Sequence, residues 1–554
     1  MLNGRRRVSG LLGIGGGVLA MLCSASGLQA QWPAASPLNV GTSEDVERWR
    51  LATLADTALA PSLFMRSTSS LGIPGRGVEL LGAELAVVHN SALPFGPNRG
   101  ALWAGRGANA SAGTAMALTA GPLRLILAPQ LVYSENQFIA RDSARFYQPD
   151  RPPDRSPYAV VWYVNGPYSA DVPIRFGGRP IRRWTPGQSS LTLSAMNTSV
   201  GVGTENHWWG PGFRNALILS NNAEGFPHAF IRSALPWRTP LGAVEFRWIV
   251  GGLTESQYFD ADPDNDLRSL SAAIVTLEPW RARNLTVGLA RAVMGTSTGW
   301  SEIAGRWLEV LHDAGRPNNV SVSDSALSPG GREQVFSYFG RLRLPKSGFE
   351  VHGEVGFTES PRSLRDLILT PTHTRAYTIG MQWRSSPDQS FWRVQSEVTT
   401  VEQGSSFRDR PLGVWYTSRR VIQGYTNRGQ PLGAAVGPGS SGQWLAVDRF
   451  SARTRFGLYA GRSRHNEDVR SIYAFPDYQS YCNRDVNTYV GATTSAETRF
   501  GRISVDATLG NRINLWFQMG SGCPGGDAQI DVRNRTLSFT FEPLRRRAPA
   551  GSPR

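Results

Sequence analysis

The segment 205–222 carries the densest group of side chains that could bind a ligand. It reads ENHWWGPGFRNALILSNN, and VIQGYTNRGQPLG at 421–433 again combines an aromatic ring with a guanidinium group. Sugars present apolar C–H faces that stack on aromatic rings, and hydroxyl groups that pair with planar amides, carboxylates and guanidinium groups. The two segments therefore predict polysaccharide binding through a set of aromatic and polar residues: Glu205, Asn206, His207, Trp208, Trp209, Arg214, Asn221, Asn222, Tyr425 and Arg428.

The same residues also allow a purely structural interpretation. The sequence WWGPG at 208–212 can form a turn between two strands, with its tryptophans in the aromatic belt of a membrane interface. The pair Asn221-Asn222 is likewise typical of a turn. Residue types alone leave both interpretations open.

Three glutamates could act as the paired acids of a glycosidase. Glu350 and Glu354 lie four residues apart on a predicted strand, which places them about 13 Å apart. Glycosidases need their two carboxyl groups ~5–9.5 Å apart, so we expect Glu350, Glu354 and Glu397 to pair with arginines such as Arg393 instead. The sequence contains no recognised nucleophile, zinc or nucleotide-binding motif. It therefore predicts neither an enzyme nor a cofactor.

The segment FDADPDND carries alternating aspartates that could bind calcium: Asp260, Asp262, Asp264 and Asp266. An EF-hand loop also needs a glycine turn and a closing glutamate, and this segment has neither, with Ser271 at the closing position. We therefore favour a solvated acidic loop over a calcium site. The 7 histidines are scattered and predict no other metal site.

The chain of 554 residues is basic, with a net charge of +15 and a pI of about 10.2. Nearly all of the positive charge is arginine, since Lys346 is the only lysine. This balance allows an anionic lipid or polymer as partner, and it equally allows a genome that prefers arginine. No basic helix interleaved with aromatic residues is present, so nucleic acid is not predicted.

Residues 1–30 have the pattern of a cleaved signal peptide. Arg5 to Arg7 form a positive segment, 11–22 form an apolar one, and Leu28-Gln29-Ala30 is a cleavage site. Export would leave Cys482 and Cys523 in an oxidising compartment, where they could form a disulfide or remain separate thiols.

Residues 31–78 are predicted to form a helical plug segment on the periplasmic side. A helix over 42–60 would start at Thr42 as N-cap, with acidic residues in its first turn, and would end before Pro61. Its apolar stripe at helical spacing needs a surface to bury it: Val46, Trp49, Thr53 and Leu54. The mouth of a barrel is such a surface.

From residue 79 to 542 the hydrophobic pattern alternates with a period of two. In 349–357, for example, apolar Val351 and Val355 alternate with Glu350 and Glu354, and 243–250 and 501–509 behave in the same way. An apolar face and a charged face are both satisfied in an all-β transmembrane barrel with lipid outside and a wet, charged lumen. We therefore expect a large antiparallel barrel of about 18 strands and a basic C-terminal tail over 543–554.

The approximate strands lie at 79–89, 113–120, 122–133, 190–203, 213–220, 227–235, 243–253, 268–277, 284–293, 335–344, 349–358, 374–383, 391–401, 442–448, 452–462, 485–496, 501–511 and 533–541. The connections between them tend to alternate between long and short, as in outer-membrane barrels, which have long outer loops and short periplasmic turns.

The motifs resemble those of the Wzi family of outer-membrane capsule assembly proteins. The resemblance is carried by WWGPG at 208–212 with LILSNN at 217–222, and it is supported by LWAGRGAN at 102–109 and GPLRLILAPQLVYS at 121–134. It implies a barrel of about 18 strands, a plug on the periplasmic side, and a lectin-like role that holds capsular or exported polysaccharide at the cell surface. The short helical segment departs from a complete plug.

The leading hypothesis is therefore a non-enzymatic, polysaccharide-binding barrel of the outer membrane. The alternative is a porin for small solutes, in which an arginine-lined lumen would favour anions, and an outer-membrane hydrolase ranks last. We expect outer-membrane lipid and the barrel-insertion machinery as further partners, and a monomer.

Overall fold

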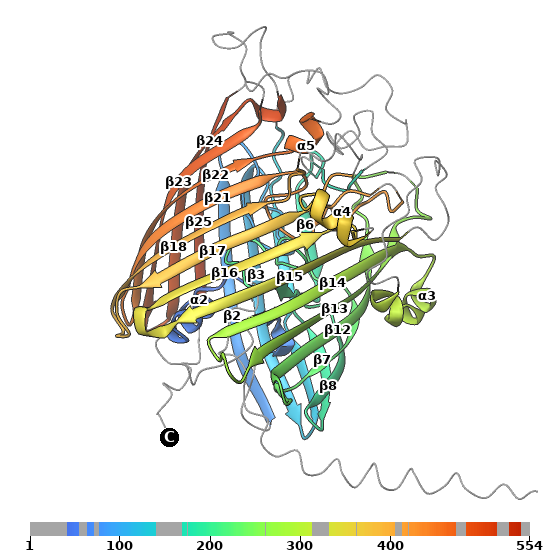
Figure 1. The fold of residues 1–554 in the computed structure, drawn as a ribbon. Helices are drawn as coiled ribbons and strands as arrows, with labels where there is room; N and C mark the ends of the chain where they lie inside the picture. The colour runs from blue at the N-terminus through green and yellow to red at the C-terminus, as the bar shows by residue number, and fades with distance from the viewer. Residues whose placement is uncertain are drawn as a thin grey trace, which may run out of the picture.

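The computed structural model describes residues 41–54, 64–70, 77–139, 169–173, 176–260, 262–312, 332–361, 363–404, 413–418, 420–471, 484–517 and 531–543. Its strands form a closed antiparallel barrel of 18 strands, as predicted (Figure 1). The predicted signal peptide, Cys482, Cys523 and the tail beyond Pro543 lie outside the described residues. Among the helices that the structure describes, none is long and apolar enough to cross a membrane.

The wall of the barrel consists of β2 (Gly77–Asn90), β3 (Gly107–Ala120), β4 (Leu123–Leu127), β5 (Gln130–Ser134), β6 (Ile181–Thr185), β7 (Ser190–Ala195), β8 (Thr198–Gly203), β10 (His228–Ser233), β11 (Trp237–Arg238), β12 (Gly242–Thr254), β13 (Leu267–Pro279), β14 (Leu285–Thr296), β15 (Arg332–Leu344), β16 (Phe349–Phe357), β17 (Ala376–Arg384), β18 (Phe391–Thr400), β21 (Ser441–Phe450), β22 (Thr454–Arg464), β23 (Val486–Thr498), β24 (Gly501–Ile513) and β25 (Val532–Pro543). These 21 segments make up 18 strands, because β4 with β5, β6 with β7, and β10 with β11 each lie along the same neighbouring strand and form one interrupted strand. The barrel closes where β2 pairs with β25.

The remaining elements are short: α2 (Glu44–Ala52), β1 (Met65–Arg66), η2 (Thr68–Ser70), β9 (Trp208–Trp209), α3 (Trp300–Gly305), η3 (Trp307–Leu311), η4 (Pro345–Ser347), α4 (Leu364–Leu369), β19 (Thr426–Asn427), β20 (Gln430–Pro431), α5 (Glu467–Val469) and η7 (Leu515–Phe517).

The alternating pattern places side chains on the two faces of the wall as predicted. Val355 on β16 and Leu509 on β24 are exposed on the outside, whereas Glu350 and Glu354 point into the lumen and are fully buried. The wall can therefore meet lipid with apolar side chains while its backbone groups pair from strand to strand.

Two of the predicted strands between residues 190 and 220 are wrong. The segment 190–203 is a hairpin of β7 and β8, and Met196 and Asn197 form its turn, both with positive φ. The segment 213–220 is irregular and lies inside the barrel, because its apolar residues pack in the lumen and not against lipid. Strand β6 was not predicted. The expected number of strands was correct because the extra strand of the hairpin offsets the one wrongly placed at 213–220, and β6 forms a single interrupted strand with β7.

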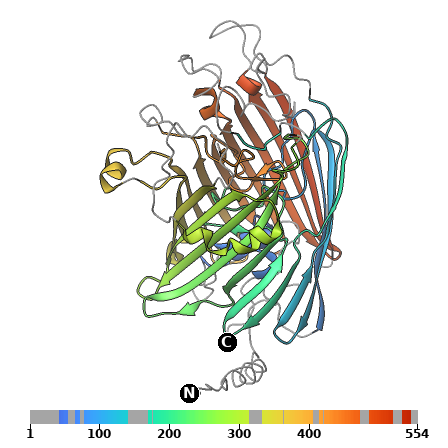
Figure 2. The same ribbon diagram turned by 90° about the vertical axis from the view of Figure 1, so that its right-hand side faces the viewer.

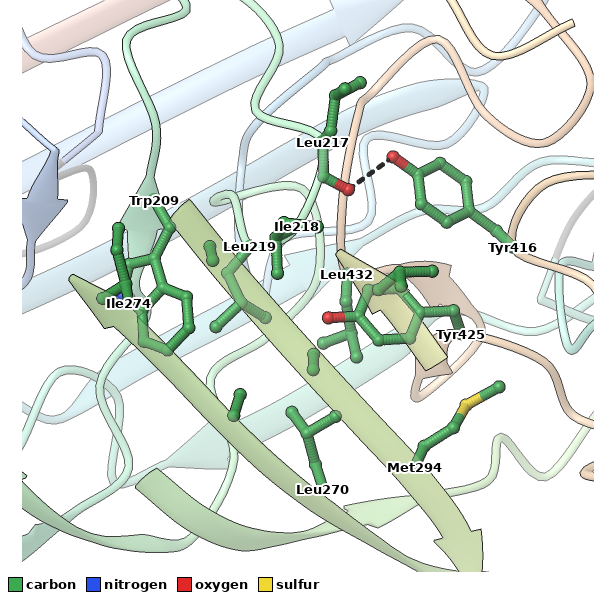
Figure 3. Close-up of a cluster of buried hydrophobic side chains, with 14 of the residues drawn as sticks. Trp209, Leu217, Ile218, Leu219, Leu270, Ile274, Met294, Tyr416, Tyr425 and Leu432 are labelled. Carbon is green, nitrogen blue, oxygen red and sulfur yellow. Dashed lines mark hydrogen bonds between the residues drawn. The ribbon is translucent and has the colours of Figure 1, made fainter. Parts of the chain in front are cut away.

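The lumen is largely filled, which corrects the expectation of a wet interior. Two segments, named here inner loop 1 (204–227) and inner loop 2 (413–418 and 420–440), enter the barrel and pack against the inner faces of β12 to β14. Trp209, Leu217 and Leu219 of inner loop 1 meet Leu270 of the wall and Tyr425 of inner loop 2 in one buried cluster (Figure 3). This apolar core stabilises the two loops as it would stabilise a soluble domain.

Helix α2 lies at the end of the barrel that carries the short turns (Figure 1). Its N-cap is Ser43, not Thr42, and it ends at Ala52, earlier than predicted, with Thr53 as C-cap. Of the predicted stripe, Val46 and Leu54 are buried, as is Thr53, while Trp49 is only half-buried.

The main anchor of α2 is Arg50, which was not part of the predicted apolar stripe. Its guanidinium donates to Glu350 and to the carbonyl of Pro211, and Arg341 donates to the other oxygen of Glu350 at 2.6 Å. All three charged side chains are buried. A buried carboxylate with two guanidinium partners therefore ties the helix to the wall.

Replacing Glu350 with Gln should lower the free energy of unfolding by on the order of 3 kcal/mol, because two buried guanidinium groups lose their counter-charge. Heat- or urea-induced unfolding of the folded barrel in detergent measures this change. The matched control is Glu302→Gln, which removes a partly exposed pair with Arg306 and should change stability by less than about 1 kcal/mol. Equal effects of the two changes would contradict the assignment.

Candidate functional site

The WWGPG motif forms a structural element inside the barrel. Trp208 and Trp209 make up β9, which pairs with Arg66 and Met65 of β1. Both indole rings are fully buried, and the guanidinium of Arg66 lies 5.1 Å from the ring of Trp208. The tryptophans are therefore neither in an interface belt, as one interpretation had it, nor open to a ligand in this structure.

Glycine is required at the next position. Gly210 has φ of +112°, which strains any residue with a side chain, and a Cβ there would lie 2.9 Å from a carboxylate oxygen of Glu354. The turn that follows is held by Glu397, which accepts hydrogen bonds from the backbone N–H groups of Phe213 and Arg214, and of Asn215 at 2.9 Å.

Glu205 is the centre of a second buried network. It accepts hydrogen bonds from Ser69 and forms an ion pair with Arg247. Together with His207 and His228 it forms a group that could hold a metal ion, with the ligand atoms within 4.8 Å of one another. The guanidinium of Arg247 already balances the charge of Glu205 and would repel a metal cation. The Nε2 atoms of the two histidines lie 3.0 Å apart, which is a hydrogen-bond distance. Burial lowers the pKa of His207 well below its ordinary value, so this ring is neutral.

Three further predicted residues are buried and structural. Asn206 donates to the carbonyl of Ala223 at 2.7 Å and accepts from Gln188, and Asn221 is 2% exposed. Tyr425 stacks on Tyr416 with ring centroids 5.8 Å apart, and burial raises the pKa of its phenol well above the ordinary value. These residues build the inner loops and cannot touch a ligand outside them.

Two predicted residues, Arg214 and Asn222, line an accessible cavity of about 280 Å³ on the long-loop side of the inner loops. Four aromatic side chains and a set of planar polar ones share it: Phe95, Trp103, Trp444, Tyr489, Asn215, Gln443, Asn487 and Asn534. Arg428, in contrast, does not line the cavity; it is partly exposed and its Nε lies 3.4 Å from Glu224. The structure therefore brings only part of the predicted set to one site.

The cavity contains polar groups without partners. The guanidinium of Arg214 lies 5.1 Å from the ring of Trp444 and has no carboxylate partner in the part of the chain that the structure describes. Trp444 Nε1, His465 Nε2 and Asn215 Oδ1 are buried atoms without a hydrogen bond among the described residues. The indole N–H and the guanidinium favour a ligand with hydroxyl or carboxylate oxygens, and the amide oxygen of Asn215 favours a hydroxyl group that donates to it.

The sequence contained a signal for the cavity residues that were not predicted. Trp444 and Tyr489 occupy one row of lumen-facing positions, with Gly461 between them on β22. A Cβ at Gly461 would lie 2.2 Å from the Tyr489 ring, so the glycine leaves room for the ring. Lumen-facing aromatic residues near the long loops could therefore have been selected from the period-two pattern.

The other predictions have mixed outcomes. Glu350 does pair with arginines, but Arg393 pairs with Asp448 instead, and Glu354 and Glu397 accept mainly backbone N–H groups. In the acidic loop, the carboxylate of Asp260 accepts a hydrogen bond from the backbone N–H of Asp262, and that of Asp262 accepts one from the backbone N–H of Asp264. These hydrogen bonds stabilise the loop itself, and the choice between a solvated acidic loop and a calcium site stays a prediction.

A family model for the capsule assembly protein Wzi matches residues 184–512, more than half of the chain. The chain belongs to the Wzi capsule assembly family. The match spans inner loop 1 and inner loop 2, and it confirms the resemblance that the motifs indicated. As a Wzi-family barrel, the protein is placed in the outer membrane. A comparison with curated protein sequences found no match.

Solved structures similar to this barrel include an Escherichia coli protein, Wzi, an outer membrane protein involved in group 1 capsule assembly and described as a carbohydrate-binding β-barrel. The two share 13% identity over 83% of this chain and 84% of that one, with a TM-score of 0.51. Pseudomonas aeruginosa OccK2 (OpdF) in complex with glucuronate is similar at 10% identity and a TM-score of 0.36, over 83% of this chain and 97% of that one. The likeness to Wzi supports the barrel fold.

The loop 169–173, which lines the cavity, should open more readily as the pH rises. Asp171 accepts hydrogen bonds from Ser256, and burial raises its pKa from 3.8 to about 6. Its contribution to stability, at most on the order of 3 kcal/mol, is complete below pH 3.8 and is lost as the pH rises through about 6.

Hydrogen–deuterium exchange of this loop, corrected for the intrinsic effect of pH, tests the prediction. Exchange should be faster at pH 7 than at pH 5, and Asp171→Asn should remove the difference. The same pH dependence in the variant would show that another group is responsible.

Proposed function

We propose that this Wzi-family barrel binds capsular or exported polysaccharide in the cavity at its long-loop end and so holds the polymer at the cell surface. The observation that carries the proposal is the composition of the cavity. Four aromatic rings and several amide side chains surround a space that opens on the side of the inner loops away from α2.

The chemistry of the cavity suits a sugar. Aromatic rings stack on the C–H faces of pyranose rings, and the planar amides of Gln443, Asn487 and Asn534 can pair with hydroxyl groups. A volume of about 280 Å³ lies just below the range of ligand pockets, which span roughly 300–1,000 Å³. The cavity therefore suits part of a polymer, whose remainder would extend among the outer loops.

The role we propose is non-enzymatic. Glu350 is held between arginines and Glu397 by backbone N–H groups, which leaves neither in the arrangement of a glycosidase acid pair. We further propose that the protein works as a monomer and that the barrel-insertion machinery and outer-membrane lipid are its other partners.

Replacing Trp444 with Ala should weaken binding of polysaccharide by about twofold to tenfold, since one stacked aromatic ring contributes roughly 0.5–1.5 kcal/mol and 1.4 kcal/mol is about a factor of ten in affinity. The purified barrel is titrated with polysaccharide extracted from the producing cells, and binding is followed by calorimetry. Trp392→Ala is the matched control, because Trp392 is half-exposed on the outer wall. Equal binding by the wild-type protein and Trp444→Ala would place the site elsewhere.

Arg214 should give the cavity a preference for acidic sugar units, because its guanidinium lies on Trp444 without a carboxylate partner among the described residues. Arg214→Gln should reduce the affinity for the native polymer, if acidic, by about tenfold and leave the affinity for its carboxyl-reduced form unchanged. Arg449→Gln is the matched control, since Arg449 lies over Trp392 outside the cavity. A similar loss for both polymer forms would argue against charge recognition.

The alternative function, a porin, predicts an open channel. The inner loops and α2 pack inside the barrel through buried contacts, so we expect the protein to be nearly silent in planar lipid bilayers. Single-channel recording tests this, with a general porin as positive control. A steady conductance of nanosiemens would favour transport.

A further inference from the structure

The two sides of the lumen differ in how far they are covered. Inner loop 1 and inner loop 2 pack against β12 to β14, where the lumen-facing Leu270 and Ile274 are fully buried. Strands β22 to β24 form the opposite side of the closed barrel (Figure 2). On these strands the lumen-facing Tyr459, Thr493 and Asp506 remain partly exposed. This side of the lumen is therefore accessible to solvent and to a ligand.

The accessible residues continue the saccharide cavity toward α2 as a row named here the polar strip: Tyr459, Thr493, Asp506 and Ser504. The row begins at the cavity, because the ring centroid of Tyr459 lies 6.4 Å from that of Tyr489, which lines the cavity. Thr493 and Asp506 are Cα partners further along β23 and β24. Ser504 is the next lumen-facing residue of β24 on the side of α2.

The groups of the polar strip suit a sugar. The hydroxyl of Tyr459 donates to Asp506 at 2.8 Å, and a carboxylate has lone pairs for further hydroxyl donors. The ring of Tyr459 lies against Gly491, where a Cβ would be 2.3 Å from its Cζ, so the glycine leaves room for the ring against the wall. The strip thus repeats the combination of an aromatic ring with polar groups that is found in the cavity.

Helix α2 lies across the far end of the polar strip. Glu44 accepts a hydrogen bond from Ser495, the Cα partner of Ser504. Asp45 pairs with Arg502 of β24 at 2.9 Å. A polymer that follows the strip inward from the cavity therefore meets α2 and stops there.

We propose that the polar strip is the inner part of the saccharide site, and that the barrel consequently binds one free end of the polymer. A site that is open at the cavity and closed at α2 admits a chain end directly, whereas a segment from the middle of a chain would have to enter folded back on itself. The cavity of about 280 Å³ is too small for two strands side by side. This inference rests on the proposed function and adds which part of the polymer is bound.

The number of barrels bound per polymer chain tests the inference. Polysaccharide extracted from the producing cells is separated by size into a short and a long fraction of known chain concentration. Each fraction is mixed with an excess of the full-length barrel in detergent, and analytical ultracentrifugation measures the mass of the complexes. We expect one barrel per chain in both fractions. A number of barrels that rises with chain length would show binding along the polymer and overturn the inference.

Variants test the polar strip itself. Thr493→Trp places a large ring in the strip and should weaken polysaccharide binding by about tenfold or more, because the chain end is excluded by the clash. Tyr459→Ala adds no bulk and should weaken binding by about twofold to tenfold through loss of one aromatic ring. Thr494→Trp is the matched control, since Thr494 is the next residue of β23 and is exposed on the outer face; it should bind as the wild-type protein does.

Heat-shifted mobility of each variant on gels establishes that the barrel is folded. If Trp444→Ala weakens binding but folded Thr493→Trp and Tyr459→Ala bind as the wild-type protein does, the strip is not part of the site; the inference is then overturned while the proposed function stands. If the wild-type barrel binds neither fraction, both are overturned.

Discussion

Three buried carboxylates hold the interior of this barrel in place. Glu205 accepts from Ser69, Glu350 from Arg50 of α2, and Glu397 from the backbone of the turn that follows WWGPG. A carboxylate in a low-dielectric interior is tolerated only when cations or N–H groups satisfy it, and losing one partner is costly. Each glutamate therefore fixes one inner segment to one place on the wall.

The filled lumen follows from this anchoring. A closed barrel leaves no unpaired strand edge and gives a rigid frame, but its interior still has to be occupied by water or by protein. Here inner loop 1 and inner loop 2 supply an apolar core together with the inner faces of β12 to β14. What remains accessible is a cavity on the long-loop side, where the aromatic rings and Arg214 lie.

The path of inner loop 1 also explains the uneven wall. The chain leaves β8 at Gly203, passes through the lumen and returns to the wall at His228, so both strands are short where the loop enters. One segment thus carries the family motif, organises the core and sets the length of the two strands that it connects.

The sequence by itself determined the barrel, its outer face and the helix at its short-turn end. The alternation of apolar and polar residues shows directly which side chains of a strand face lipid. Successive side chains of a strand point to opposite faces of the wall, so a strand with lipid on one side must alternate. It could not determine what lies in the lumen, since an apolar segment such as 213–220 has the same composition whether it crosses a membrane or fills a core. Only the tertiary structure decided that Trp208 and Trp209 are buried and that Trp444 joins Arg214. These contacts join residues far apart in the chain, and the hydrophobic pattern of a short segment does not show which distant residues it contacts.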